Sequence, residues 1–273
     1  MLKTLIPILA LSAVIVGCGT EPALIGQARK ATLVHALLDN LHASVEAEKS
    51  AVMATTDEES ITFAQESRRR TAEMNQLRDE LHRRVLDDDR PGERSKLAAF
   101  DTAWAEVRDV DERLLALAVA NSNLKAARLA AGESAVAVDR LVDALAQVAA
   151  QSSDPRVIRE VAAASVSALR IQTLLAPHVA TADDEEMTRL EARVSELGEQ
   201  VEGVLAKVRN GAASAAWRDY QRLTADVMRL SRLNTNVVSV DVSVHEKRRV
   251  TESCRNALAA LLHEIQTGPD ATR

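Results

Sequence analysis

Apolar residues recur at alternating steps of three and four along the stretch that precedes the C-terminal tail. The pattern runs from Ala216 to Gln266 with neither proline nor glycine inside it. It predicts one uninterrupted helix of roughly 55 residues, about 80 Å long at 1.5 Å per residue. Such a helix is stable only where other helices cover its apolar stripe. The positions predicted to line that stripe are Leu223, Val227, Leu230, Asn234, Val237, Asp241, Val244, Arg248, Thr251, Arg255, Leu258, Leu262 and Ile265.

The same periodicity, divided by turn residues, predicts five further helices. Thr56 to Glu59 has the spacing of a capping box, and Asp154-Pro155 is a cap followed by a first-turn proline. Gly132 lowers helix propensity by about 1 kcal/mol inside a second long helix without changing its phase. Pro177 is expected to kink or end its helix. The expected helices cover about 22–55, 56–86, 93–150, 155–180, 183–209 and 211–266, an all-α fold of six helices.

The chain carries a diverged internal duplication. Ala103-Trp104 and Asn121-Ser122-Asn123 reappear 113 residues later as Ala216-Trp217 and Asn234-Thr235-Asn236. Each repeat then consists of two short helices and one long helix, and short loops make successive helices antiparallel. The prediction is an elongated up-down bundle made of two stacked four-helix bundles that share two long helices. The proximal module would contain about 22–120 and 242–266, the distal module 121–241, and 267–273 would form a polar tail.

The first 17 residues are expected to be a signal peptide. Lys3 gives it a positive start, and the apolar run from Leu5 is too short to span a bilayer. The ending Ile15-Val16-Gly17-Cys18 resembles a bacterial lipobox, which implies lipidation of Cys18 and a periplasmic, membrane-anchored protein. Gly19 follows the cysteine in place of the aspartate that retains lipoproteins in the inner membrane, so the resemblance implies the outer membrane. The alternative is an ordinary secretory signal or anchor helix that contains a cysteine.

Composition supports long packed helices. The chain is 47% hydrophobic and 27% charged, only 2% of it is aromatic, and its formal charge is −6. Both signs of charge are mixed along the expected helices, and no basic patch alternates with aromatic residues. Nucleic acid is therefore not an expected partner.

Three motifs together resemble a receptor family. They are Glu48-Lys49-Ser50-Ala51-Val52 with the following Thr56 to Ser60, Trp104 with Asn121-Ser122-Asn123, and Asn234 to Val237 with Glu246-Lys247-Arg248. They are similar to the periplasmic four-helix-bundle sensor modules of methyl-accepting chemotaxis receptors, and the duplicated form resembles their helical bimodular sensor domain. The resemblance covers nearly all of 22–266. It implies a small ligand, often a carboxylate, and a module that can dimerise. In those receptors transmembrane helices carry the signal. Here a lipid would replace the first of these helices and nothing replaces the second, so the chain is not expected to signal across the membrane by itself.

The predicted geometry brings polar residues together at the middle of the two long helices. Asn121 and Asp241 fall near one level, and Arg128 and Asn234 near another. A buried Arg128 with His245 and Arg248 nearby could hold a carboxylate in bidentate fashion. The alternative is structural, with the asparagines fixing helix register and Arg128 paired with Asp241. The candidate ligand-binding residues are Asn121, Arg128, Asn234, Asp241, His245 and Arg248.

Other chemistry finds little support in the sequence. The six histidines form no pattern for a di-iron bundle, and no nucleophile–base set or phosphate loop is present. We therefore expect no catalytic residues, no metal and no cofactor, a buried inert Cys254, and Trp104 and Trp217 in the core. Two functions remain open. One is a lipid-anchored sensor-like module that binds a small molecule or a membrane receptor. The other is a structural or interaction lipoprotein of the envelope without a small ligand.

Overall fold

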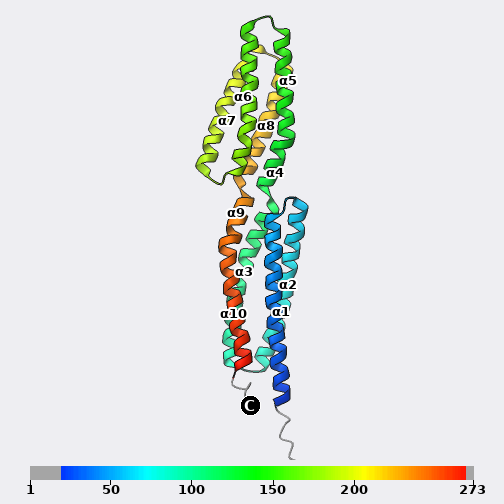
Figure 1. The fold of residues 1–273 in the computed structure, drawn as a ribbon, viewed down its shortest axis with the longest axis vertical. Helices are drawn as coiled ribbons and strands as arrows, with labels where there is room; N and C mark the ends of the chain where they lie inside the picture. Colours follow the sequence, from blue (N-terminus) through cyan, green and yellow to red (C-terminus); the bar gives the residue numbers. More distant parts are fainter. Residues whose placement is uncertain (1–19, 269–273) are drawn as a thin grey trace, which may run out of the picture. The chain divides into compact units, whose positions relative to one another are not determined.

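The computed structural model describes residues 20–268, and within this range every regular element is a helix. All six predicted helices are found, two of them in several pieces, which confirms the all-α class (Figure 1). The elements are α1 (Thr20–Met53), α2 (Asp57–Asp87), α3 (Pro91–Ala120), α4 (Ser122–Leu129), the π-helical turn η1 (Ala130–Ser134), α5 (Ala135–Gln151), α6 (Pro155–Ala180), α7 (Asp184–Val208), α8 (Gly211–Leu233), α9 (Thr235–Val242), the π-helical turn η2 (Ser243–Lys247) and α10 (Arg248–Thr267).

Local signals set the ends of the helices. The backbone N–H of Glu59 donates to the Thr56 hydroxyl at 3.1 Å, as the capping-box spacing predicts. Asp154 and Asp183 accept backbone N–H groups at the starts of α6 and α7, and Asn210 does so for α8. These side chains satisfy donors that have no partner within the helix, which is why the sequence reveals the boundaries.

The helix predicted over 216–266 is not uninterrupted, and the long helix predicted over 93–150 is divided as well. Asn121 separates α3 from α4, and Asn234 separates α8 from α9. Both residues are left-handed, with φ of 49° and 51°. Asparagine tolerates this conformation better than other residues with a Cβ atom, so it can break a helix where no glycine stands. Gly132 does mark an irregularity, because it lies within η1.

The breaks shift the buried face, so the predicted stripe is only partly correct. Leu223, Val227, Leu258 and Ile265 are buried, whereas Asp241, Val244, Arg248 and Arg255 are exposed. Around each break and π-helical turn the inward positions recur every four residues, because a π-helical turn holds more residues than an α-helical one. These positions carry mostly small side chains: Ala118, Ser122, Ala126, Ala130 and Ser134 in one repeat, and Ser231, Thr235, Ser239, Ser243 and Lys247 in the other.

The chain divides into two compact units. The first contains the described residues up to Ala43, Arg69–Val107 and the residues from Val250 onward. Its interior includes the fully buried ammonium of Lys30, which lies 2.5 Å from Glu93 and 2.6 Å from Asp88. Trp104 is buried as predicted, and its indole N–H donates to Asn75 at 2.9 Å.

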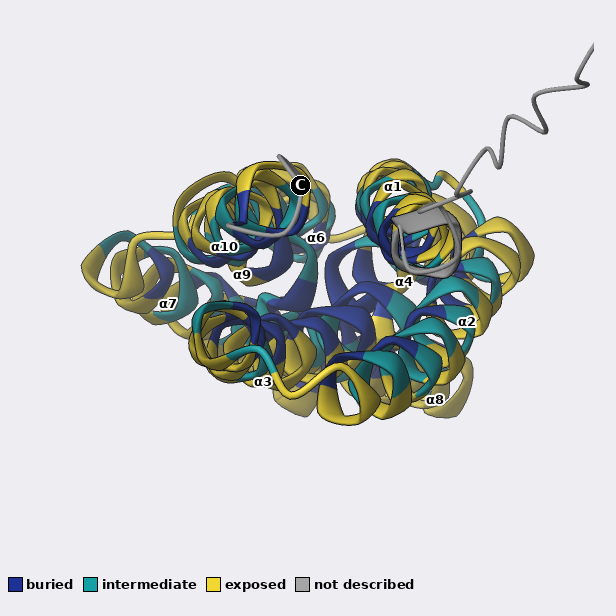
Figure 2. Cartoon of the chain, turned by 90° about the horizontal axis from the view of Figure 1, so that it is seen from below, coloured by how far each residue is buried: buried dark blue, intermediate teal, exposed yellow. Residues whose placement is uncertain are grey.

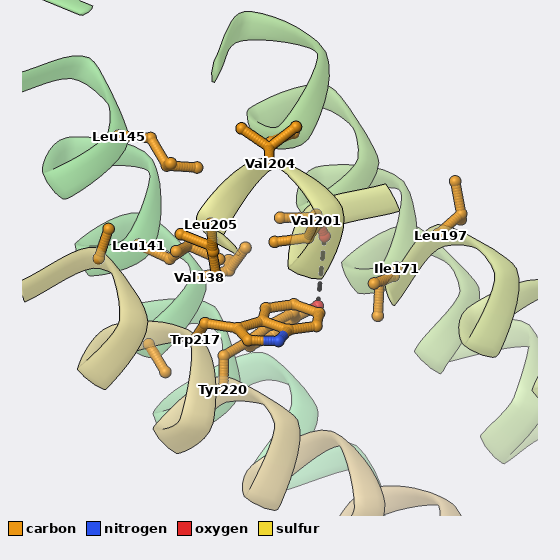
Figure 3. Packing of buried hydrophobic residues seen from close by; sticks show 14 of the residues in the cluster. Val138, Leu141, Leu145, Ile171, Leu197, Val201, Val204, Leu205, Trp217 and Tyr220 are labelled. Carbon is orange, nitrogen blue, oxygen red and sulfur yellow. Dashed lines mark hydrogen bonds between the residues drawn. The ribbon is translucent and has the colours of Figure 1, made fainter. Parts of the chain in front are cut away.

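The second unit contains Ser44–Arg68 and Arg108–Arg249. Trp217 and Tyr220 of α8 pack against apolar residues of α5, α6 and α7, and the Tyr220 hydroxyl donates to the Ala168 carbonyl at 3.3 Å (Figure 3). Each helix is buried along one side and exposed along the other, the usual arrangement of a bundle (Figure 2). The predicted module limits and their stacking stay predictions.

The predicted signal peptide and Cys18 lie outside the described residues. Within residues 20–268, no helix is both long and apolar enough to cross a membrane.

Candidate functional site

The two Asn-Ser/Thr-Asn tripeptides meet in the second unit. We call residues 121–123 and 234–236 the Asn junction. The N–H of Ser122 donates to the Thr235 hydroxyl at 3.0 Å, and the N–H of Thr235 donates to the Ser122 hydroxyl at 3.0 Å. Each hydroxyl therefore accepts the first N–H of the helix that begins in the other repeat.

The asparagines of the Asn junction repeat this exchange. The N–H of Asn123 donates to Asn236 Oδ1 at 3.1 Å, and the N–H of Asn236 donates to Asn123 Oδ1 at 3.3 Å. Asn236 Nδ2 donates to Asn121 Oδ1, and Asn123 Nδ2 donates to Asn234 Oδ1, both at 2.9 Å. Asn121 and Asn234, two of the predicted ligand residues, are thus brought together but bonded to the opposite repeat.

Arg128 is not buried, contrary to the prediction. Its side chain is 47% exposed, and it donates to the Thr55 carbonyl at 2.8 Å and lies 3.7 Å from Asp57. The prediction extended the heptad phase of α3 past Asn121, where the backbone changes direction. The buried stripe of α4 follows Ala126 and Ala130 instead, so the guanidinium points outward.

The other predicted ligand residues do not join Arg128. Asp241 and His245 are exposed and lie 3.6 Å apart on one face, and Arg248 is exposed as well. The predicted Arg128–Asp241 pair does not form. Asp241 and His245 border a shallow surface hollow of about 500 Å³ that is otherwise lined by Asn236 and three valines. The six residues therefore do not assemble one carboxylate site.

A buried ion cluster lies next to the π-helical turn η2. The Lys247 ammonium lies 2.5 Å from Asp111 Oδ1, and the Ser243 hydroxyl donates to Glu48 Oε1 at 2.8 Å. Burial raises the pKa of both carboxyl groups, and Lys247 opposes this effect. Glu48 Oε2 and Asp111 Oδ2 lack a hydrogen-bond partner among the described residues. Two carboxyl groups thus share a single buried cation.

Glu48→Gln is expected to flatten the pH dependence of stability. The folded pKa of Glu48 lies above its ordinary value of 4.5, so the folded state holds its proton more tightly. The unfolding free energy therefore falls as pH rises from about 4.5 through the folded pKa. Urea unfolding at pH 4 to 8 measures this slope. Glu46→Gln is the control, because the Glu46 side chain is 76% exposed. An unchanged slope in Glu48→Gln would contradict the assignment.

A groove of about 530 Å³ lies between α7 and α8. Helix α7 packs along α6 and touches α8 more sparsely. The floor includes Ile171, Trp217 and Tyr220. The groove is lined by Ile171, Glu191, Val194, Ser195, Gly198, Glu199, Glu202, Trp217, Tyr220, Gln221, Thr224, Ala225 and Met228.

Arg232, His178 and Glu191 form a clamp beside the groove, which Glu191 also lines. Arg232 Nε and Nη2 donate to the two carboxylate oxygens of Glu191 at 2.8 and 2.9 Å, and Arg232 also reaches Asp184. The buried His178 contacts Glu191 through Nε2 at 3.0 Å. Arg232, then His178, lower the pKa of Glu191 by hydrogen bonding to its charged form. The clamp ties α6, α7 and α8 together.

Ser231, His178 and Glu191 have the connectivity of a catalytic triad, but the serine cannot act as a nucleophile in this conformation. His178 Nδ1 lies 2.9 Å from the Ser231 hydroxyl. That hydroxyl is fully buried and donates to the His178 backbone carbonyl at 2.8 Å. A nucleophile needs access to substrate and a base that takes its proton. These contacts are explained by packing among α6, α7 and α8.

Gly198→Ala is expected to stabilise the protein by about 0.5–1 kcal/mol, because glycine is unfavourable inside a helix. An added Cβ would lie 3.6 Å from the Trp217 ring, which is ordinary contact. Gly203→Ala, on the same helix with no atom within 4 Å, is the matched control. Urea unfolding compares them. If Gly198→Ala were less stable than the wild type while Gly203→Ala were more stable, residue 198 would lie too close to the Trp217 ring for an added Cβ.

Hydrophobic periodicity missed the residues that matter most here. Lys247, Asp111 and the small residues of the Asn junction give no apolar signal. The duplication does provide a signal for these positions. The π-helical turns η1 and η2 lie 113 residues apart, which is also the offset between the repeated asparagines. The groove residues have no sequence motif.

Comparisons with known proteins give no match: no protein-family model, no curated protein and no solved structure matches the chain. In the part of the chain that the structure describes, no three histidine, cysteine, aspartate or glutamate side chains are grouped closely enough to hold a metal ion.

Proposed function

We propose that this chain is a lipid-anchored, non-catalytic binding module of the sensor type. It takes a small molecule in the α7–α8 groove and presents the occupied state to a membrane receptor or another envelope protein. The observation that carries the proposal is the groove, whose volume of about 530 Å³ falls within the range of small-molecule sites. Its aromatic floor and its carboxylate rim supply the apolar body and the few polar groups that such sites combine.

The course of α8 supports a sensor rather than a simple carrier. Trp217 and Tyr220 lie at the groove, and the same helix ends at Asn234 in the Asn junction. Arg232, two residues before that end, holds Glu191 of α7. A ligand that changes the spacing of α7 and α8 therefore acts on the helix that enters the Asn junction, where the backbone is already irregular. Irregular backbone of this kind can act as a hinge, so a movement of α8 can change its direction relative to α9.

The anchor in this proposal comes from the sequence. The ending at Cys18 resembles a lipobox, and two or three acyl chains hold a protein on a membrane where one chain is marginal. The resemblance to chemoreceptor sensor modules supports a position on the periplasmic face. Gly19 after the cysteine favours the outer membrane.

The second candidate is an interaction lipoprotein of the envelope without a small ligand. It is favoured by the Asn junction, whose polar groups satisfy one another and leave no free cation for an acid. It is also favoured by α9 and the adjoining turn, where Val238, Val240 and Val244 are between 41% and 51% exposed. Exposed apolar side chains on one segment are common at protein contacts.

Thermal unfolding of the full chain in detergent distinguishes the two candidates. The panel contains small carboxylates, amino acids and amines. A ligand at 100 times its dissociation constant adds about 2.7 kcal/mol to the unfolding free energy and raises Tm by several degrees. Gly198→Leu, which fills the groove beside Trp217, should abolish a true hit. If no compound in the panel raises Tm, the sensor proposal is rejected and the interaction protein is favoured.

Radiolabelled palmitate tests the anchor separately. The full chain expressed in a bacterium that processes lipoproteins is expected to take up the label and to fractionate with membranes. Cys18→Ser should lose both properties. A labelled Cys18→Ser chain, or an unlabelled wild-type chain, would reject the lipid anchor.

A further inference from the structure

We propose that the α7–α8 groove selects an organic cation, such as a diamine or a quaternary ammonium compound. This inference rests on the proposed function, since it assigns a ligand class to the same groove. It reverses the ligand class that the sequence suggested, because the carboxylate expectation depended on Arg128 and that residue lies elsewhere.

The charge of the groove is the first argument. Its lining contains three carboxylates and, among the described residues, no lysine, arginine or histidine. Glu191 is neutralised by Arg232. Glu202 accepts only neutral donors, the Trp217 indole at 3.3 Å and the Gln221 amide at 2.6 Å. Glu199 has no ion-pair partner among the described residues. Two negative charges thus face the groove without a cation, and they attract a cation and repel an acid.

The floor of the groove is the second argument. The Trp217 and Tyr220 rings lie 5.9 Å apart at an interplanar angle of 49° (Figure 3). Tyr220 is fully buried, whereas Trp217 keeps 5% of its surface exposed, so an ammonium group near the Trp217 ring gains a cation–π attraction in addition to its attraction to carboxylates. The alkyl part of an amine would contact Ile171, Val194 and Met228. Aromatic rings beside carboxylates suit a cation with an apolar body.

The third argument is a buried polar group at the same place. Thr224 is 4% exposed and lines the groove beside the Tyr220 phenol. Its hydroxyl oxygen has no well-aligned hydrogen-bond partner among the described residues. A buried hydroxyl without such a partner loses the hydration it would have in water. The N–H of a bound diamine would supply the missing donor, a contact that a quaternary ammonium compound cannot make.

Isothermal titration calorimetry of the full chain in detergent tests the proposal. The probes are 1,4-diaminobutane, tetramethylammonium and, as an anion of similar length, succinate, all at one ionic strength. Saturable binding is expected for at least one cation and none for succinate. Replacing both Glu199 and Glu202 by glutamine should weaken cation binding at least tenfold. Raising the salt concentration should weaken it as well, because the exposed carboxylates are screened.

The matched control replaces two other glutamates by glutamine. Glu160 and Glu196 lie on α6 and α7, have side chains that are 42% and 57% exposed, and pair with Lys207 and Arg193 outside the groove. This double variant loses the same charge and should bind the cation as the wild type does. Circular dichroism confirms that both double variants keep their helix content.

The remaining outcomes separate this inference from the proposed function. Succinate binding without cation binding, or cation binding that survives the Glu199 and Glu202 replacements, overturns the cation site while leaving a sensor module in place. If no cation binds but another compound in the thermal panel does, the ligand class alone is rejected. If nothing in either experiment binds, the sensor proposal falls together with the cation site.

Discussion

Lys247→Met is expected to destabilise the second unit by about 3–5 kcal/mol. The Lys247 side chain is 2% exposed, and its ammonium lies 2.5 Å from Asp111. Methionine matches its length and apolar stem, so the substitution removes the charge with little change in volume. The remaining carboxyl groups of Asp111 and Glu48 would then be buried without a buried cation beside them. Urea unfolding at pH 7 measures the loss.

The pH dependence of this variant identifies the cause. Lys247 holds the pKa of Asp111 and Glu48 down against the effect of burial, so its loss raises both pKa values further. A folded pKa above the unfolded value lowers stability as pH rises, and the penalty disappears below the unfolded values of 3.8 and 4.5. The loss in Lys247→Met should therefore be greatest at neutral pH and should shrink toward pH 4. A loss that does not change with pH would indicate altered packing.

The duplication suggests a rescue. By the offset of 113 residues, Thr224 of the second repeat corresponds to Asp111 and Ser134 of the first repeat corresponds to Lys247, so the pair of positions related to Asp111 and Lys247 by the duplication carries no charge. Asp111→Thr combined with Lys247→Met should recover at least half of the loss, because replacing a whole buried pair costs far less than breaking it. No recovery would mean that the ammonium stabilises the fold through Glu48 rather than Asp111.

Helix ends could be predicted where a few neighbouring residues determine them. Helix α6 spans Pro155–Ala180, as expected, because Asp154 and Pro155 form a cap and a first turn without help from distant residues. The capping box at Thr56 behaves in the same way. Such signals depend on local hydrogen bonds, so they can be recognised from the sequence.

The helix breaks could not be predicted from periodicity. Asn121 and Asn234 occupy positions that fit an uninterrupted helix, and a heptad reading continues across them. The left-handed backbone conformation of these residues is unfavourable, and hydrogen bonds between tripeptides 113 residues apart compensate for its energetic cost. Alanine and serine in the buried stripe contribute no hydrophobic signal. The four-residue spacing of the inward positions could therefore not be detected from hydrophobic periodicity. Only the repeated tripeptides indicated that these positions are special.

The candidate site was missed for the same reason. Arg128 was placed in the interior by extending a phase that changes at Asn121. The groove depends on how far α7 lies from α8, and nothing in either helix specifies that distance. Trp217 was expected to be a core residue and is buried, but no sequence motif indicated that its indole N–H would donate to Glu202 of α7.

Asn123→Ala is expected to destabilise the second unit by about 3 kcal/mol. Asn123 is buried, and its amide donates to the Val179 carbonyl at 3.0 Å and to Asn234 Oδ1 at 2.9 Å. Its oxygen accepts the N–H of Asn236 at 3.3 Å. Each lost hydrogen bond costs about 1 kcal/mol, and more where the partner stays buried. Urea unfolding gives the total.

Asn123→Asp separates the two roles of this side chain. Aspartate keeps an oxygen for the N–H of Asn236 but cannot donate to Val179 when ionised. It also places a negative charge beside a carbonyl in a buried site. The aspartate variant should therefore be as unstable as the alanine variant at neutral pH, and should recover as pH falls and the carboxyl group gains a proton.

A double-mutant cycle tests whether the Asn junction acts as one unit. Asn236→Ala removes the reciprocal bonds, including the one from its amide to Asn121. If the reciprocal hydrogen bonds are cooperative, the Asn123→Ala and Asn236→Ala double variant should lose less unfolding free energy than the sum of the two single variants. The difference should be about 0.5–3 kcal/mol. Strict additivity would mean that each asparagine stabilises its own helix only. In that case the symmetry of the Asn junction would reflect the duplication without coupling the two repeats, and the route from the groove through α8 would lose its physical basis.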